Sequence, residues 1–136
     1  LEMVGLAGFE DRLPHELSGG MRQRCAIVRA LAHEPPLLLM DEPFAALDAL
    51  TRRKMQEELL ALWEEARFTV LFVTHSIEEA IIVGSRILVM SPHPGRVKAE
   101  LDADGFDHRS VGGEPFQKLQ SRIHDMLFAD RVESHG

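Results

Sequence analysis

The sequence predicts an α/β fold in which a mostly parallel sheet is flanked by helices. Three mainly apolar runs, at residues 37–40, 68–73 and 86–90, have the length and composition of strands. Segments with apolar residues at helical spacing lie between and around these runs. Strands that alternate with helices along a chain are typical of a sheet covered by helices.

Bulk composition narrows the class of protein. With 136 residues, of which 45% are hydrophobic and 27% charged, the chain is one soluble-type globular domain or part of one. The net charge of −7 argues against a nucleic-acid partner, which would favour a basic face. The single cysteine cannot form an internal disulfide, and no apolar run approaches the roughly 20 residues that span a bilayer. Because the first residue is Leu1 rather than methionine, we expect further residues before it.

The first elements follow from capping and breaker residues. Residues 1–16 predict the end of a helix and a loop around Pro14. Ser18 is a good N-cap for a helix over about residues 19–33, which Glu34-Pro35-Pro36 ends. Its expected buried face is formed by Met21, Cys25, Val28 and Ala32. The continuous apolar run at 37–41 predicts a strand covered on both faces.

Later elements repeat these signals. The expected order is a helix at 48–67, a strand at 68–74, a short helix at 76–83 ended by Gly84, a strand at 86–90, a turn at 92–95, an antiparallel strand at 96–101, a loop at 102–113 and a helix at 114–128. The expected buried residues of the two long helices are Met55, Leu59, Leu62 and Trp63, and Phe116, Leu119, Ile123 and Leu127. We expect residues 1–101 to form the core and residues 102–136 a loop and an amphipathic helix that packs on its own domain.

Two acidic residues at the end of the first predicted strand are candidates for chemistry. In open α/β sheets ligands collect at the carboxyl ends of strands. There Asp41 could hold Mg²⁺, directly or through water, and Glu42 could deprotonate an attacking water. The alternative is a strand that ends in a polar turn before Pro43.

Three further positions carry weaker signals. His75 ends the next strand and could contact a γ-phosphate, or it could be an ordinary exposed histidine. Ser18-Gly19-Gly20 would place a hydroxyl and free backbone N–H groups at a helix N-terminus, which suits a phosphate, although an ordinary capped helix has the same pattern. Asp48 could cap the following helix or act across a subunit interface.

Taken in order, these features resemble the ATP-binding-cassette (ABC) ATPases. The matching segments are Leu17 to Gly20 with Gln23-Arg24 (the signature motif), Leu37 to Glu42 (the Walker B strand), Ala46-Leu47-Asp48 (the D-loop) and Thr74-His75 (the switch histidine). The resemblance covers roughly residues 1–101 and implies the carboxyl-terminal part of a RecA-like P-loop NTPase domain, with the end of its helical signature subdomain. The Walker A loop, Gly-x-x-x-x-Gly-Lys-Ser/Thr, is absent, since the sequence contains no Gly-Lys pair. Neither the glutamine loop nor the adenine platform is identifiable.

The resemblance also implies roles for single residues. Such ATPases form head-to-tail dimers that hold two ATP molecules with Mg²⁺ at their interface. Asp41 would serve Mg²⁺ through water, Glu42 would be the general base and His75 would contact the γ-phosphate. The implied nucleotide-binding or coupling positions are Ser18, Gly19, Gly20, Gln23 and Asp48. Without a Walker A loop, the 136-residue chain alone is expected to bind ATP weakly and to hydrolyse it poorly or not at all.

A finer similarity points to bacterial nitrate, sulfonate and taurine importers. Met21 and the segments 41–52, 71–80 and 91–96 are similar to the ATPases of that group. This implies a peripheral subunit on the cytoplasmic face of the cell membrane, bound to permease subunits. A solute-binding protein would deliver the solute to the permease. Two alternatives stay open: a soluble ABC-type ATPase of DNA repair or translation, and an inactive fragment that serves only as a binding or dimerisation module.

Overall fold

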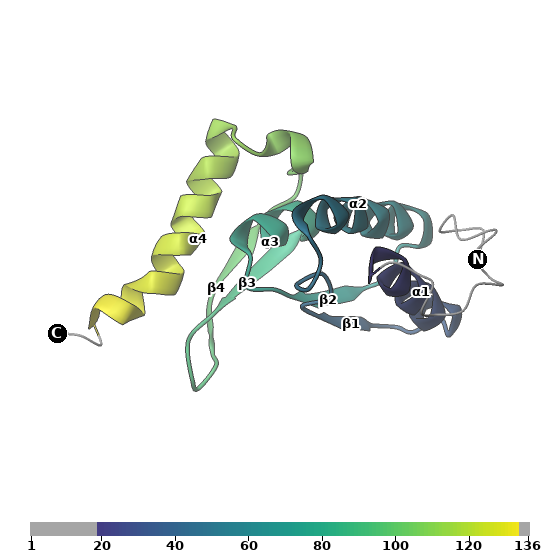
Figure 1. Ribbon diagram of the computed structural model, residues 1–136. Coiled ribbons are helices and arrows are strands. Elements are labelled where there is room, and N and C mark those ends of the chain that lie inside the picture. Colours follow the sequence, from purple (N-terminus) through teal and green to yellow (C-terminus); the bar gives the residue numbers. More distant parts are fainter. Residues whose placement is uncertain (1–18, 134–136) are drawn as a thin grey trace. The chain divides into compact units, whose positions relative to one another are not determined.

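The computed structural model describes residues 19–133 and divides into two compact units, residues 1–74 and 75–136 (Figure 1). In the described part, each unit has its own two-stranded sheet and its own helices. This confirms the α/β class. The predictions for residues 1–18 lie outside the described residues, and the division after residue 101 stays a prediction.

The first unit is built on a parallel pair of strands. Strand β1 (Leu38–Asp41) pairs with β2 (Val70–Val73), with Leu39 opposite Leu71 and Asp41 opposite Val73. Parallel neighbours need a long crossover, which here contains helix α2 (Ala49–Ala66). Both strands are shorter than predicted, but they lie within the predicted runs.

Helix α1 (Gly19–Ala32) has the predicted extent but a different buried face. Ile27 is buried in the core, whereas Cys25 and Val28 are only half-buried and Ala32 is exposed. The predicted face was therefore wrong at Ala32 and missed Ile27. The side chain of Met21 lies outside the described residues.

Helix α2 shows the N-cap that the sequence offered for Asp48 and most of the predicted face. Asp48 is its N-cap, and its C-cap Arg67 adopts the left-handed conformation that commonly ends helices. Of the predicted residues, Met55, Leu59 and Leu62 are buried. Trp63 is only half-buried, and the Arg67 guanidinium carbon lies 4.3 Å from the centre of its ring.

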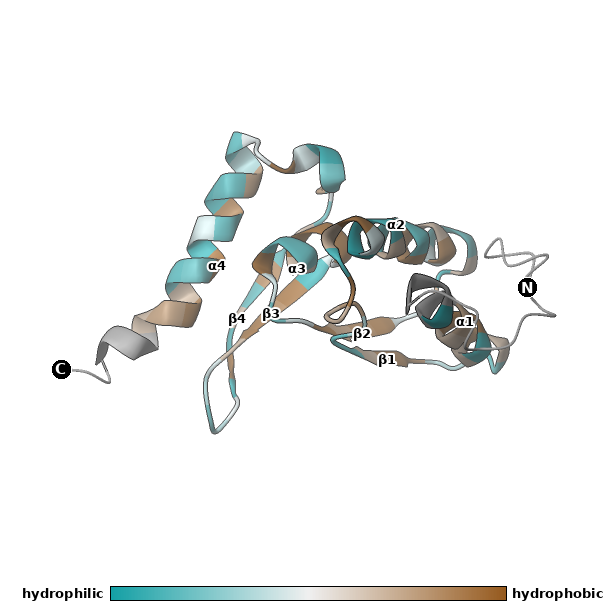
Figure 2. Cartoon of the chain, viewed as in Figure 1, coloured by the Kyte–Doolittle hydropathy of each residue, from teal (hydrophilic) through white to brown (hydrophobic). Residues whose placement is uncertain are grey.

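Both helices of this unit cover the same face of the sheet. The core comprises Ile27 of α1, Met40 of β1, Phe44, and the buried residues of α2, with Val70 and Phe72 packed against it. The opposite face carries Leu39, Leu71 and Val73, which are exposed in the described part of the chain; Leu39 is 63% exposed. The prediction that the first strand is covered on both faces is thus wrong for the described residues. Figure 2 shows the apolar character of both strands.

The second unit contains the predicted antiparallel hairpin. Helix α3 (Ile77–Val83) precedes β3 (Arg86–Met90), which pairs with β4 (Val97–Asp102). A 3-10 helix, η3 (His108–Ser110), interrupts the predicted loop. Helix α4 (Glu114–Glu133) extends past its predicted end at residue 128.

Helix α4 packs on its own unit, as predicted. It contacts α3 and β3, and Phe116 and Ile123 are buried while Leu119 and Leu127 are half-buried. Lys98 Nζ of β4 donates a hydrogen bond to the Met126 carbonyl over 2.6 Å. No helix among residues 19–133 combines the length and the apolar character that crossing a membrane requires.

Candidate functional site

Asp41 and Glu42 lie where the sequence places them, at the carboxyl end of β1. Asp41 is the last residue of the strand, and its side chain is exposed. The Glu42 N–H donates to the Val73 carbonyl over 2.7 Å. This bond keeps the end of β1 beside the end of β2, so both acidic residues lie at the edge of the sheet where ligands of α/β folds collect.

The backbone of Glu42 is in an unusual conformation. Its φ is 46°, in the left-handed region that residues with a Cβ rarely adopt. Such a conformation costs of the order of 1–3 kcal/mol and persists where the surroundings hold it. Here Glu42 makes the bond to Val73 and its carbonyl accepts from the Ala45 N–H over 3.3 Å. The chain therefore turns directly after the candidate base.

Phe44 anchors the loop that follows, residues 43–48. Its side chain is completely buried, and its ring centre lies 5.8 Å from that of Phe72 on β2. The Phe44 carbonyl accepts a hydrogen bond from the Leu47 N–H over 3.1 Å. The loop is therefore attached to the core beside the candidate site.

Asp48 ends this loop and caps α2. Its carboxylate accepts bonds from the Thr51 N–H over 2.8 Å and from the Thr51 hydroxyl over 3.0 Å. These two bonds, the backbone bond first, lower the pKa of Asp48 below its ordinary value of 3.8. The capping alternative is thus confirmed, while a role across a subunit interface stays a prediction.

Arg52 is a residue for which the sequence predicted no role. Its guanidinium donates to three backbone carbonyls of the same loop, those of Phe44, Ala45 and Leu47. The available signal was its position four residues after the N-cap, one turn into α2 and facing back over the loop.

The remaining predicted residues are divided between the two units. Gly19 and Gly20 form the first turn of α1, a helix of 14 residues, where N–H groups without helical partners suit an anion. Ser18 and the side chain of Gln23 lie outside the described residues. His75 is exposed and opens the second unit, ahead of Ser76, the N-cap of α3. The structure thus brings together Asp41, Glu42 and the loop to Asp48.

Residues 19–133 could supply only a few side-chain ligands to a divalent cation. Among residues 19–133 no three histidine, cysteine or acidic side chains gather in a way that could hold a metal ion. Mg²⁺ does not need such a cage, because it commonly keeps several waters and binds one or two carboxylates with substrate phosphates. An exposed Asp41 at a strand end fits that mode.

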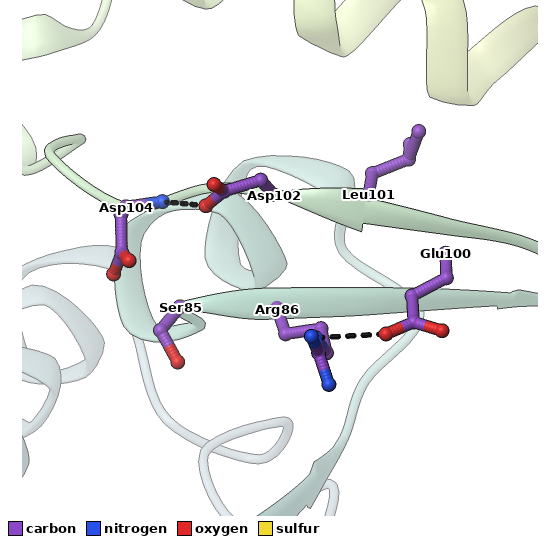
Figure 3. Close-up of a pocket in the computed structure, with 6 residues that line it drawn as sticks. All are labelled: Ser85, Arg86, Glu100, Leu101, Asp102 and Asp104. Atoms are coloured by element: carbon purple, nitrogen blue, oxygen red, sulfur yellow. Dashed lines mark hydrogen bonds and ion pairs between the residues drawn. The ribbon is translucent and has the colours of Figure 1, made fainter.

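A hollow of about 620 Å³ lies elsewhere, beside β3 and β4 (Figure 3). It is lined by Ser85, Arg86, Glu100, Leu101, Asp102 and Asp104. Arg86 Nε contacts Glu100 Oε1 at 2.8 Å, and these side chains are 75% and 51% exposed. Walls this exposed do not enclose a ligand, and none of the predicted site residues lies there.

Comparison with known proteins agrees with these motifs. A family model described as "ABC transporter" matches residues 1–45. A taurine import ATP-binding protein of Rhizobium johnstonii is 51% identical over 93% of this chain. Another taurine import ATP-binding protein, from a Jannaschia species, is 53% identical over the whole chain. The chain spans about half the length of these curated relatives, 52% and 53%.

A solved structure is similar to this chain in fold. An ATP-binding cassette, determined as a dimer in a post-hydrolysis state with ADP and phosphate, is similar with a TM-score of 0.56 and 42% identity. The similarity covers 77% of this chain and 46% of that chain.

Proposed function

Because the chain is part of an ABC ATPase domain, we propose that the complete protein binds and hydrolyses ATP as the nucleotide-binding subunit of a membrane importer. In this proposal residues 1–101 belong to the ATPase core, and residues 102–136 form an extension that carries α4.

One observation carries the proposal. Asp41 and Glu42 lie together at the carboxyl end of a parallel strand, and the backbone of Glu42 is bound to the neighbouring strand. This is the edge where α/β sheets bind ligands. The chain that contains this pair is 51% identical to a protein that is named as a taurine import ATP-binding protein.

The chemistry assigned to the pair is hydrolysis of the terminal phosphate. Glu42 would take a proton from a water molecule whose oxygen attacks the γ-phosphorus, while the bond to the β-phosphate oxygen breaks and ADP leaves. Asp41 would hold Mg²⁺ through water, and the cation would offset the negative charge of the phosphates. His75 would contact the γ-phosphate. No covalent intermediate on the protein is needed.

A second copy of the domain would complete the nucleotide site. We propose that the start of α1 binds the γ-phosphate of a nucleotide held by the partner, using Ser18, Gly19, Gly20 and Gln23. Asp48 would couple the two sites. The similar cassette was determined as a dimer bound to ADP and phosphate, which supports the proposal that two copies associate.

The importer proposal concerns the partners of the complete protein. Permease subunits would hold it at the cytoplasmic face of the membrane as a peripheral subunit, and a solute-binding protein would deliver the solute to the permease. The names of the taurine importers among the relatives support a small sulfonate such as taurine, and nitrate is a further candidate. The solute would never touch this subunit.

The proposal is tested with the product of the complete reading frame that contains this sequence. We expect Mg²⁺-dependent ATP hydrolysis that Glu42→Gln lowers by about 100-fold or more, because a general base contributes that much or more. ATP binding should persist in the variant, since Gln keeps the shape of the side chain. The measurements are phosphate release and the Kd for ATP.

A matched control is Glu65→Gln, which removes an exposed carboxylate from α2. It should leave turnover unchanged. Full activity of the Glu42→Gln protein would exclude Glu42 as the base, and a parent protein without ATPase activity would favour the inactive module. The importer proposal is tested by reconstitution with the permease subunits and the solute-binding protein. ATPase activity that taurine stimulates would support it.

A further inference from the structure

The loop of residues 43–48 connects two residues of the proposed site, Glu42 and Asp48. It is irregular and contains two hydrogen-bonded turns, in which the Ala45 N–H donates to the Glu42 carbonyl and the Leu47 N–H to the Phe44 carbonyl, over 3.3 and 3.1 Å. Backbone carbonyls in such a loop need further partners if the loop is to keep one conformation.

Arg52 supplies those partners from the first turns of α2. Its Nε donates to the Phe44 carbonyl over 3.2 Å, and its Nη2 donates to the carbonyls of Ala45 and Leu47 over 3.3 and 3.0 Å. The side chain is half-buried, and its backbone N–H is bound to the Asp48 carbonyl over 2.8 Å. A guanidinium is planar and offers its donors in a rigid fork. One cation therefore joins three loop carbonyls to the helix.

We propose that Arg52 is a positioning residue for ATP hydrolysis, which acts by holding the 43–48 loop and through it Glu42 and Asp48. This inference rests on the proposed function. Arg52 would touch neither the nucleotide nor the attacking water. Its effect would arise because a general base must lie within hydrogen-bonding reach of the water, and a displacement of about 1 Å can lower a rate about 100-fold.

The chain offers a matched control in the next residue. Arg53 also lies in the first turns of α2, but its side chain is 61% exposed and pairs with Glu57 on the surface at 3.4 Å. Arg53→Ala removes the same charge and a similar side chain without touching the loop. A difference between the two alanine variants is therefore due to the carbonyl contacts rather than to the loss of charge.

The experiment uses the product of the complete reading frame and three variants, Arg52→Ala, Arg52→Lys and Arg53→Ala. We expect Arg52→Ala to lower kcat by about 10- to 100-fold while KM for ATP stays within about threefold. A misplaced base stabilises the transition state less well but leaves binding of ATP in the ground state nearly unchanged. Arg52→Lys should give an intermediate kcat, since an ammonium can reach some of the carbonyls but lacks the fork. Arg53→Ala should match the parent protein.

Thermal unfolding and active-site titration with ATP separate positioning from folding. If Arg52→Ala lowers the melting temperature but keeps the kcat per folded molecule, or if Arg53→Ala loses as much activity, the inference is wrong. If Arg52→Ala does not fold, the Arg52→Lys variant is the test. A kcat equal to that of the parent in Arg52→Lys would then overturn the inference. A parent protein without turnover would instead contradict the proposed function, and this inference with it.

Discussion

Glu42 differs from the other non-glycine residues with positive φ in the described part of the chain. Glu34 and Arg67 also have φ of 47°, but Arg67 directly follows α2 and Glu34 lies two residues after α1, and the N–H of each donates to a carbonyl in the last turn of its helix. Glu42, at 46°, follows a strand instead. Its conformation has no capping role there, which is the pattern expected of strain held at a functional position.

The pH dependence of Asp48 is a prediction at the same scale. Its pKa is lowered in the folded chain by the bonds from Thr51. The carboxylate therefore adds stability above its unfolded pKa, and this contribution is lost as the pH falls through the lower folded pKa. Asp48→Asn keeps a good N-cap but does not titrate. As the pH falls from about 7 to below the ordinary pKa of 3.8, the free energy of unfolding of the parent should decrease relative to that of the variant. Denaturant titration at each pH measures this difference. A difference that does not change with pH would contradict it.

Local sequence signals set the residues at which helices and strands end, whereas packing decides which of their faces is buried. Helix α4 continues five residues beyond the predicted end because residues 129–133 contain neither glycine nor proline to end it. In β3, Ile87 and Val89 are buried whereas Leu88 and Met90 are exposed. Alternation of this kind is typical of an antiparallel strand with one covered face.

Gly84, at the end of α3, permits a prediction about one element. A Cβ added there would lie 2.7 Å from the Ala80 carbonyl oxygen, which accepts the bond that ends the helix. Because this neighbour is backbone, Gly84→Ala should lower the free energy of unfolding by about 1–3 kcal/mol. Gly95→Ala is the control, because a Cβ there would lie 3.9 Å from the end of the Met90 side chain, an ordinary contact distance, and a change within about 0.5 kcal/mol is expected. Equal stability of both variants in denaturant unfolding would contradict the prediction.

At the scale of the whole molecule, one face of the β1–β2 sheet is exposed, and the chain spans only part of the length of its relatives. Parallel sheets are normally buried on both faces, yet Leu39, Leu71 and Val73 are exposed in the described part. The chain spans about half of its curated relatives. The similarity to solved cassettes confirms the predicted ABC ATPase fold.

The activity of the 136-residue chain by itself is the corresponding prediction. It has no Gly-Lys pair and so lacks the lysine and the amide groups that would cradle the phosphates. Loss of even one such donor lowers rates by about 100-fold or more, so its ATPase rate should be at least that far below that of the complete reading-frame product. The check is phosphate release at equal molar concentrations. Robust turnover by the chain alone, abolished by Glu42→Gln, would show that the missing loop is not needed.

The sequence by itself determined the α/β class, the order of the helices and strands, and the placement of Asp41 and Glu42 at a strand end. It offered Asp48 as a helix cap beside one alternative, and the structure shows the cap. These predictions depend on signals that act within a few residues: capping side chains, prolines and apolar periodicity. Tertiary structure alone decided that Ile27 rather than Ala32 is buried and that Arg52 binds the 43–48 loop. Burial depends on which surfaces meet in the fold, and the Arg52 contacts depend on the path of an irregular loop; capping and periodicity signals specify neither.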